Sequence, residues 1–340
     1  MTRLCKRGES RVGYYGNISI SLLAQRPMSP FINPKTDFAF KKIFGSPQSK
    51  DILISFLNGL LYGGKLAIQD LRILDPYQAP RIEGMKESYL DVKAELTDGS
   101  AIIIEMQVLN VLGFKKRVLY NAAKAFSTQL EMGEDYTLLN PVIALTITDF
   151  EMFEHSDRVI SRYRLKEKDD LTDYSDDIEL VFAELPKFSK GIDDLISLTD
   201  KWLYFLKEAN HLESIPASLE REIAIQNAFE VARQSRLTRE EMEILDRQAM
   251  FIHDSRNALL LGQAQALEKG LKQGIEQGIE QGIEQGIEQG IEQGIEQGQR
   301  QAKMAMARSL LNKLPIADIS QVTGLTTDEI TRLKGDRGDR

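Results

Sequence analysis

Glu105 and Gln107 are polar residues within an otherwise apolar segment, AIIIEMQVL, that reads as a buried β-strand. The branched apolar residues at 102–104 suit a strand that is covered on both faces of its sheet. Because side chains alternate along a strand, residues two apart project from the same face. A buried carboxylate is costly unless it is paired or bound to a metal ion, so the pair predicts a functional site.

Asp91 is the candidate partner of this pair. The segments SYLDVKAEL and AIIIEMQVL flank the turn sequence TDGS, which together predict a β-hairpin. A strict two-residue turn would pair Asp91 with Met106 and direct its side chain away from Glu105. A three-residue turn or a bulge would instead put Asp91, Glu105 and Gln107 on one face. A metal site therefore predicts a loop wider than two residues, or a bulge.

Two carboxylates from adjacent strands have the chemistry that a hard divalent cation requires. Mg²⁺ takes oxygen ligands, keeps several waters and is commonly held by one or two carboxylates together with a substrate phosphate. Such a cation would activate water and stabilise charge on a phosphodiester during hydrolysis. Gln107 would lie beside that water, able to orient it or the phosphate. The alternative is that these side chains form the solvated face of an ordinary hairpin.

The elements that must position these residues can be read from the surrounding sequence. Thr36 and Gly45 are the expected caps of a first short helix, and Ser49 and Gly63 those of a second. The spacing of apolar residues predicts a third helix that ends near Gly133. Further strands are expected in LAIQDLRILDP, NPVIALTITDF and IELVFAELPKF, and a helix in LTDKWLYFLKEA. Helices and strands in this mixed order predict an α/β sandwich.

Several of these segments, in this order and spacing, resemble the PD-(D/E)XK nuclease family transposases, which belong with the recombination-promoting nuclease (Rpn) proteins of bacteria. The resemblance covers roughly residues 29–210. Its motifs are FINPKTDFAFKKIFG, YLDVKAELTDGSAIIIEMQ, GFKKRVLYNAAKAFSTQLEMGEDY, PVIALTITDF, ELPKF and KWLYFLKEA.

The resemblance implies a restriction-endonuclease-like core with a mixed central sheet flanked by helices, Mg²⁺ dependence with Mn²⁺ as a substitute, and cleavage of DNA. The family's aspartate falls on Asp91 and its glutamate on Glu105, with the backbone carbonyl of Met106 as a further metal ligand. Gln107 occupies the position of the wider superfamily's lysine. Because a neutral amide can only hydrogen-bond, slow or regulated cleavage is expected. Transposition is not inferred.

Flanking polar residues are candidates for contacts with DNA or phosphate. Asp37 and Lys41 lie one turn apart on the first helix, where an ordinary surface ion pair is the alternative. Arg117 and Tyr120 match the resembled pattern and lie one turn apart in the third helix. The basic cluster just after the glutamate strand suits DNA phosphates, although it could equally be a solvated start of a helix; it consists of Lys115, Lys116 and Arg117.

Composition excludes several other classes of protein. A net charge of −8 argues against a protein that coats nucleic acid with its whole surface. A single cysteine, Cys5, permits no intrachain disulfide and no cysteine-rich zinc site. No apolar run reaches the roughly 18 residues of a membrane span, so a cytoplasmic protein with no membrane partner is expected. Residues 1–27 are Arg-rich and acid-poor, which suits a transit peptide, but an unstructured or mis-assigned start that makes Met28 the first residue is favoured.

Residues 274–297 are six identical Gly-Ile-Glu-Gln units. Glycine at every fourth position disfavours a lone helix by about 1 kcal/mol each relative to alanine. The isoleucines form a stripe that drifts by about 40° per unit around a straight helix. An oligomerising coiled coil with right-handed winding and a flexible, partly helical spacer are both compatible with this pattern. Beyond the repeat, IADISQVTGLTTDEITRL resembles a helix-turn-helix, though a small packing or oligomerisation module fits as well.

The sequence therefore predicts a metal-dependent DNA endonuclease, hydrolysing phosphodiester bonds, that forms a homo-oligomer through its C-terminal repeat and tail. The alternatives are a DNA-binding regulatory oligomer with weak or no catalysis on the same fold, and an oligomeric scaffold. The expected parts are a start segment at 1–27, a nuclease-like domain at 28–210, a helical region at 211–270, the repeat at 271–299 and a small helical tail at 300–340.

Overall fold

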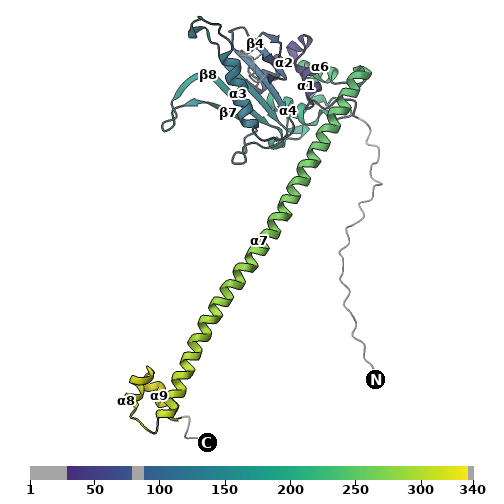
Figure 1. Ribbon diagram of the computed structural model, residues 1–340. Helices are drawn as coiled ribbons and strands as arrows, with labels where there is room; N and C mark the ends of the chain where they lie inside the picture. The colour runs from purple at the N-terminus through teal and green to yellow at the C-terminus, as the bar shows by residue number, and fades with distance from the viewer. Residues whose placement is uncertain (1–28, 79–87, 336–340) are drawn as a thin grey trace, which may run out of the picture. The chain divides into compact units, whose positions relative to one another are not determined.

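The computed structural model describes residues 29–78 and 88–335 (Figure 1), and the expected start segment lies outside them. The chain divides into two compact units, with the boundary between Arg256 and Asn257. The first unit contains a six-stranded sheet and the helices that cover it. The second contains the repeat and the C-terminal helices.

The first two helices form where the capping residues predict them. Helix α1 spans Asp37–Phe44, and the Thr36 side chain accepts a hydrogen bond from Ala39 N. Helix α2 spans Lys50–Tyr62 and ends at Gly63, whose φ of 62° lies in the left-handed region that glycine adopts without strain.

The central sheet has the strand order β1-β4-β5-β6-β8-β7. Pairs β1–β4, β4–β5 and β7–β8 are antiparallel, whereas β5–β6 and β6–β8 are parallel. The strands are β1 (Leu71–Leu74), β4 (Val92–Leu96), β5 (Ala101–Gln107), β6 (Val142–Thr148), β7 (Ile160–Lys166) and β8 (Asp173–Glu184). A separate two-stranded sheet pairs β2 (Tyr77–Gln78) with β3 (Ser88–Tyr89). The mixed sheet confirms the expected fold class.

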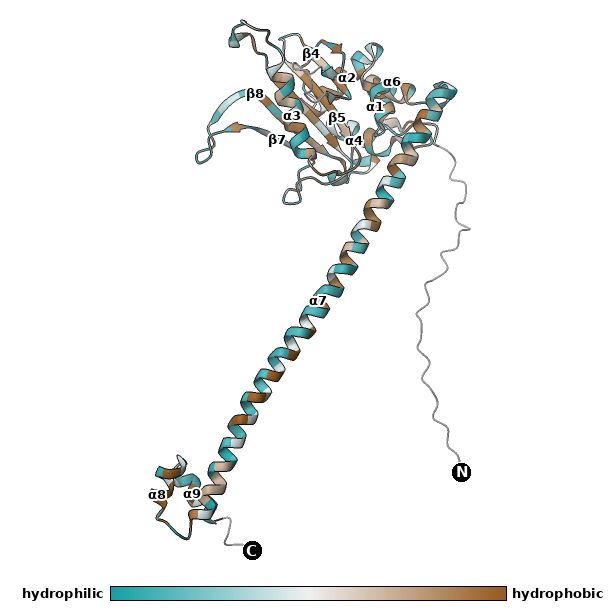
Figure 2. Ribbon diagram, in the orientation of Figure 1, coloured by the Kyte–Doolittle hydropathy of each residue, from teal (hydrophilic) through white to brown (hydrophobic). Residues whose placement is uncertain are grey.

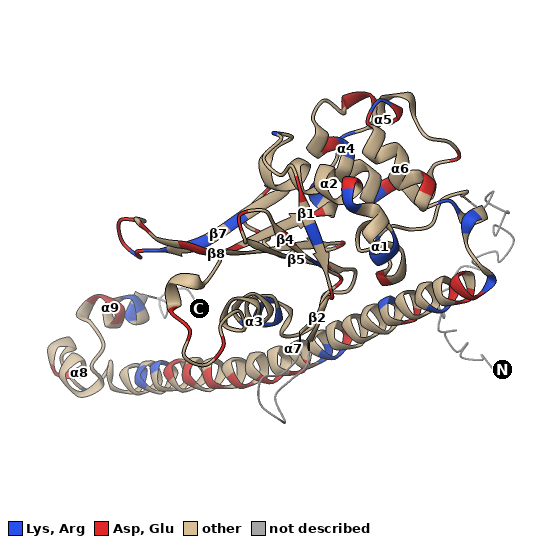
Figure 3. Ribbon diagram, turned by 90° about the horizontal axis from the view of Figure 1, so that it is seen from above, with Lys and Arg blue, Asp and Glu red and all other residues tan. Residues whose placement is uncertain are grey.

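Helices cover both faces of the sheet (Figure 3). One face packs against α1, α2, α4 (Leu198–Glu208) and α6 (Ile223–Val231), and its core includes Ile102, Ile104 and Met106 of β5. The other face packs against α3 (Phe114–Ser127), which contacts Ile103 through its alanines. The odd-numbered residues of β5, including Glu105 and Gln107, therefore face α3.

The third helix is shorter than its apolar spacing predicts, because α3 ends at Ser127 rather than near Gly133. Residues Tyr136–Leu138 form one of several single 3₁₀ turns in the first unit. The others are Pro47–Ser49, Leu185–Lys187, Ile192–Asp194, Ala209–His211 and Gln234–Arg236.

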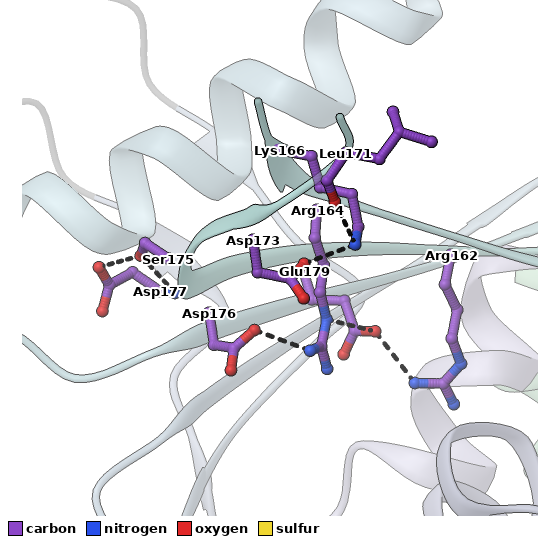
Figure 4. A network of polar contacts seen from close by, with 9 residues as sticks. All are labelled: Arg162, Arg164, Lys166, Leu171, Asp173, Ser175, Asp176, Asp177 and Glu179. Carbon is purple, nitrogen blue, oxygen red and sulfur yellow. Dashed lines mark hydrogen bonds and ion pairs between the residues drawn. The ribbon is translucent and has the colours of Figure 1, made fainter. Parts of the chain in front are cut away.

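Strand β7 was not predicted from the sequence. It is an edge strand whose residues from Arg162 onward are exposed, so it lacks the apolar run that marks β6. Its polar side chains instead pair across the hairpin with β8 (Figure 4). Arg164 bonds Asp176 at 2.7 Å, and Lys166 bonds Asp173 at 2.7 Å. Charged side chains on an edge strand discourage its pairing with the strand of another chain.

The core of the first unit continues past residue 210. Helix α5 (Ala217–Glu220) precedes α6, whose Phe229 packs edge-on against Phe205 and Phe31. The start of α7 (Arg239–Leu310) also bonds to this unit. Gln248 Oε1 accepts from Phe38 N, and Arg256 bonds the Asp149 carboxylate at 2.7 Å.

The second unit begins within α7, and the whole Gly-Ile-Glu-Gln repeat is helical. Hydrophobic residues recur along this helix between hydrophilic ones (Figure 2). The six repeat isoleucines are each 54–58% exposed. Helices α8 (Ile316–Thr323) and α9 (Thr327–Gly335) follow, joined at Gly324 as the helix-turn-helix pattern predicts, and they bury Ile319 and Ile330 against Ala307 of α7. Among the helices of the described residues, none is long and apolar enough to cross a membrane.

Candidate active site

The β4–β5 hairpin has the wider loop that a metal site requires. Val92 pairs with Ile104 and Glu95 with Ala101. Leu96 N donates to Ser100 O at 2.9 Å, which leaves the three residues 97–99 in the loop. The paired register ends at Val92, and Asp91 N also donates to Ile104 O, at 3.2 Å, so Asp91 lies at an irregular end of the strand beside Ile104 rather than paired with Met106.

Gly99 makes this loop possible. Its φ is 88°, in the region that favours glycine, and its N–H donates to Leu96 O at 3.0 Å. An added Cβ at this position would lie 2.7 Å from the Asn140 side chain. The loop sequence TDGS therefore determines the register that brings the two acids to the same place.

Asp91, Glu105 and Gln107 line one cleft of about 780 Å³, together with Met106. The wall opposite the hairpin is the first part of α3, which contributes residues 113–117 except Lys115, and also Tyr120 and Asn121. The hairpin residues of this cleft come from two neighbouring segments of the chain. The α3 residues lie on one side of their helix because they recur at helical spacing.

Asp91 lies just before β4 and is largely buried, with 12% of its side chain exposed. Its Oδ2 accepts a hydrogen bond from Met106 N at 2.6 Å. Burial raises the pKa of Asp91 to about 7, the bond from Met106 N–H opposes the shift, and Asp37 adds to it. The Lys41 ammonium lies 3.7 Å from Asp91 Oδ1 and provides only partial compensation.

Lys41 is shared between two acids. Its Nζ lies 2.6 Å from Asp37 Oδ1, one turn earlier on α1. Burial lowers the pKa of Lys41, but its hydrogen bond to Asp37 and the charges of Asp37 and Asp91 outweigh that effect, so the net pKa is raised. The pair is therefore an i,i+4 ion pair that also lies beside Asp91, and a contact of either residue with DNA or phosphate stays a prediction.

Glu105 projects toward α3 with 14% of its side chain exposed. Burial raises the pKa of Glu105, while the Arg117 guanidinium, 2.7 Å from Oε1, and a hydrogen bond with Asn121 lower it without cancelling the shift. Asn121 Oδ1 is buried and has no hydrogen-bond partner among the described residues.

Gln107 is held at both ends of its amide. Oε1 accepts a hydrogen bond from Arg117 at 2.6 Å, and Nε2 donates to Leu109 O at 2.8 Å. Sequence reasoning placed Arg117 among the contacts to DNA and did not anticipate that it bonds both Glu105 and Gln107. The signal was available, since Arg117 and Asn121 are one turn apart on a helix that directly follows the glutamate strand.

The other candidate contacts on α3 take different positions. Lys116 and Tyr120 line the cleft. Lys115 lies over the Phe153 ring, with its Nζ 5.0 Å from the ring centroid, and is not among the residues that line the cleft. The predicted basic cluster is therefore split by the helical geometry of α3.

The donor set fits a Mg²⁺ ion that keeps several waters. No group of three or more His, Cys, Asp or Glu residues suited to metal binding occurs in the described residues, but Mg²⁺ commonly needs only one or two carboxylates. Gln107 O accepts from Asp149 N on the β6 side of β5. Because backbone groups alternate along a strand, the Met106 carbonyl points to the opposite side, toward Asp91. Two under-compensated carboxylates and this carbonyl suit a divalent cation.

Comparison with known proteins gives one match. A family model described as PD-(D/E)XK nuclease family transposase matches residues 34–261, a region that starts before α1 and ends within α7. Neither a search of curated proteins nor a search of solved structures gave a significant match. The match covers more than half of the 340 residues and contains the whole hairpin and α3. The chain thus belongs to the PD-(D/E)XK nuclease family transposases.

Proposed function

We propose that the protein is a Mg²⁺-dependent DNA endonuclease that hydrolyses phosphodiester bonds. The observation that carries this proposal is the pair of buried carboxylates, Asp91 and Glu105, whose pKa values are both raised at the cleft between the hairpin and α3. Perturbed pKa values in a cleft are typical of functional sites. PD-(D/E)XK nucleases typically use a divalent metal ion, and family membership points to DNA as the substrate.

Asp91, Glu105 and the Met106 carbonyl would hold the ion, which Mn²⁺ could replace. A bound Mg²⁺ lowers the pKa of a coordinated water and neutralises charge on the scissile phosphate. In the reaction, the oxygen of water bonds to phosphorus while one P–O ester bond breaks, and the departing oxygen receives a proton. Gln107 Nε2 carries a second hydrogen beyond the one bonded to Leu109 O, and this hydrogen can be donated to the water or phosphate.

The cleft also has groups suited to the DNA backbone. Lys116, Arg117 and Tyr120 project from α3 into the cleft, and Asp37 and Lys41 stand at its α1 side. Cationic side chains along one wall suit phosphates, which supply most of the affinity of sequence-independent DNA binding. Lys115 would act from outside the cleft, where it lies over Phe153.

A second candidate function is DNA binding and regulation with little or no cleavage. It is favoured by the ion pair between Arg117 and Glu105, because this pair reduces the negative charge that Glu105 offers to a metal ion. It is also favoured by Gln107, because a neutral amide does not bring the positive charge of the superfamily's lysine. This candidate predicts binding of DNA that does not depend on Mg²⁺ or on Asp91.

Nicking of supercoiled plasmid by the purified full chain separates these two functions. The nuclease requires Mg²⁺, loses cleavage in EDTA, and loses at least about 10³-fold in rate in Asp91→Ala and in Glu105→Ala. Arg72→Ala, which removes an exposed arginine paired with Glu95, is the control and should cut like the wild type. Binding of the plasmid without any metal-dependent nicking would favour the regulatory protein.

We also propose that the repeat and tail mediate homo-oligomerisation in the cytoplasm. A single helix cannot bury its own stripe of half-exposed isoleucines, so a second helix would have to cover them. The repeat glycines would allow that helix to approach closely. Sedimentation of the full chain should show an oligomer that Ile283→Asp/Ile287→Asp dissociates. An unchanged sedimentation coefficient in that variant would contradict the proposal.

A further inference from the structure

We propose that Arg117 supplies the positive charge of this active site and that Gln107 acts chiefly by holding it in place. The inference rests on the proposed nuclease function; it assigns the charge to a residue outside the three-residue motif and a positioning role to Gln107 within it. It starts from the two hydrogen bonds of Gln107.

Both polar atoms of the Gln107 amide make a hydrogen bond within the protein. Its oxygen accepts from Arg117 at 2.6 Å, and its nitrogen donates to the Leu109 carbonyl at 2.8 Å. The two partners fix the orientation of the amide, because a guanidinium can only donate and a carbonyl can only accept. The acceptor atom of Gln107 therefore faces Arg117 and is not available to a water molecule.

Arg117 is held from three directions. Its terminal nitrogen lies 2.7 Å from Glu105 Oε1 and 2.6 Å from Gln107 Oε1, and its guanidinium carbon lies 4.9 Å from the centroid of the Phe114 ring. The side chain nevertheless remains 39% exposed and lines the cleft. A guanidinium has five N–H donors, so donors remain for a phosphate oxygen in the cleft.

The start of α3 sets this position. Gly113 is the N-cap, with a φ of 82°, and Arg117 N donates to Gly113 O at 3.0 Å. The helix thus begins at Phe114, the residue whose ring supports the guanidinium. The left-handed conformation at position 113 favours glycine. With Gly113 there, the connection after β5 is short, and Arg117 lies near the end of the strand.

Lys41 and Lys115, two of the other cations near the cleft, have different surroundings. Lys41 is closest to Asp37, at 2.6 Å, and Lys115 lies over Phe153. Neither contacts Gln107 in the described structure. Among the ion pairs of the described residues, the one that Glu105 makes is with Arg117. Arg117 therefore stands where a lysine at position 107 would otherwise bring its charge, and it comes from a helix instead of the strand.

The same contact affects metal binding. A cation 2.7 Å from Glu105 lowers the negative charge that the carboxylate offers to a metal ion. Removing Arg117 should therefore weaken catalysis while strengthening binding of the metal. A residue with only a structural role would not move these two quantities in opposite directions.

The test uses four variants of the full chain: Arg117→Met, Arg117→Lys, Gln107→Lys and the double variant Gln107→Lys/Arg117→Met. Arg72→Met is the matched control, since Arg72 makes an exposed pair with Glu95 at 2.6 Å. Plasmid nicking with Mg²⁺ under enzyme excess gives the rate, and electron paramagnetic resonance of free Mn²⁺ gives the metal affinity. Thermal unfolding checks that each variant is folded.

We expect Arg117→Met to nick about 100-fold more slowly than the wild type and to bind Mn²⁺ several-fold more tightly. Gln107→Lys alone should also slow nicking, because the new ammonium would lie next to the Arg117 guanidinium and the two cations would repel each other. In the Arg117→Met background the same substitution should raise the rate at least about tenfold. Arg117→Lys keeps the charge and should retain more activity than Arg117→Met, and Arg72→Met should match the wild type.

Nicking by Arg117→Met at the wild-type rate, or a double variant no faster than Arg117→Met, would overturn the proposal. If Arg117→Met does not fold, Gln107→Lys decides, because nicking as fast as the wild type would show that no cation occupies that position. If the wild type does not nick, the nuclease function fails and the Mn²⁺ titration decides for Arg117. Tighter Mn²⁺ binding by Arg117→Met supports its role at Glu105, and equal binding overturns it.

Discussion

The acids of the cleft and the acids of β8 are similarly buried but differently surrounded. Asp91 and Glu105 have 12% and 14% of their side chains exposed, and Glu179 of β8 has 7%. Glu184, at the end of β8, is fully buried. Burial alone therefore does not distinguish the candidate site from the rest of the sheet.

On β8 the chain supplies partners for each buried carboxylate. Glu179 Oε1 lies 3.1 Å from Arg162 Nη1 and 3.3 Å from Arg164 Nε (Figure 4). Glu184 accepts hydrogen bonds from the backbone N–H groups of residues 152 and 153 and pairs with Lys187 at 2.8 Å. These acids hold strands and loops together.

In the cleft, compensation is incomplete. Asp91 receives one backbone hydrogen bond and shares Lys41 with Asp37, and Glu105 shares Arg117 with Gln107. The pKa values of both acids remain raised. The difference teaches that the fold can satisfy buried acids where they are structural, and that it leaves the cleft acids short of positive charge where a metal ion is proposed to bind.

The largest effect on stability is expected from Glu184→Ala. This substitution removes the carboxylate partner of the Lys187 ammonium, which is 6% exposed and keeps its bond to Phe153 O, and it leaves two backbone N–H groups without their acceptor, so a loss of about 3–5 kcal/mol is expected. Urea unfolding followed by the fluorescence of the buried Trp202 measures it. Asp91→Ala, measured alongside, should lose much less, and an equal loss would remove the distinction between the two sets of acids.

The pH dependence of stability should change next most, in Asp91→Asn. The pKa of Asp91 is about 7 in the folded chain and about 3.9 unfolded, so its protonated form favours the folded state. The contribution of Asp91 to the free energy of unfolding is thus fully present below pH 4 and is lost as the pH rises to about 7. The slope of this loss is at most about 1.4 kcal/mol per pH unit. Asp91→Asn should flatten this slope in metal-free protein, as measured by urea unfolding between pH 4 and 8. A slope that survives in Asp91→Asn would show that another group causes it.

A smaller loss is expected from Glu179→Gln. Arg162 and Arg164 are 38% and 40% exposed, so solvent screens much of their interaction with Glu179, and about 1 kcal/mol is expected. The difference in melting temperature from the wild type should shrink in 1 M NaCl, while plasmid nicking remains. Loss of nicking in this variant would mean that the β8 acids also serve the cleft.

The smallest effect is expected from Lys116→Ala at the cleft wall. Removing one phosphate contact should reduce the salt dependence of DNA binding by about one unit of slope, without changing the nicking rate at saturating DNA. Fluorescence anisotropy with labelled duplex at several salt concentrations measures this slope. Arg72→Ala is the matched control, and an equal change in both variants would indicate a general effect of charge.

Much of the hairpin could be predicted because local rules determine it. Gly99 and the alternation of apolar residues predict two strands and a turn, and the expected loop of more than two residues is present at 97–99. Helix caps at Thr36 and Gly63 were equally local. The roles expected of these residues came from the family resemblance, because the patterns alone did not indicate them.

Contacts between distant segments were beyond local reasoning. Strand β7 alternates arginine and lysine with Tyr163 and Leu165. A segment this charged suggests a loop when it is read alone, and its strand conformation depends on pairing with β8. The bond between Arg117 and Gln107 depends on how α3 packs against β5, which neither segment specifies alone. The raised pKa of Asp91 likewise follows from burial by the whole cleft.

Metal-dependent stabilisation of the full chain tests the central claim most directly. Thermal unfolding at pH 7.5 would be recorded with EDTA and with MgCl₂ or MnCl₂ for the wild type, Asp91→Asn, Glu105→Gln and Glu179→Gln. Because a ligand that binds only the folded state stabilises it, the metal should raise the melting temperature of the wild type and of Glu179→Gln but not of the two cleft variants. A melting temperature that metal leaves unchanged in the wild type, or raises equally in Asp91→Asn, would contradict the account.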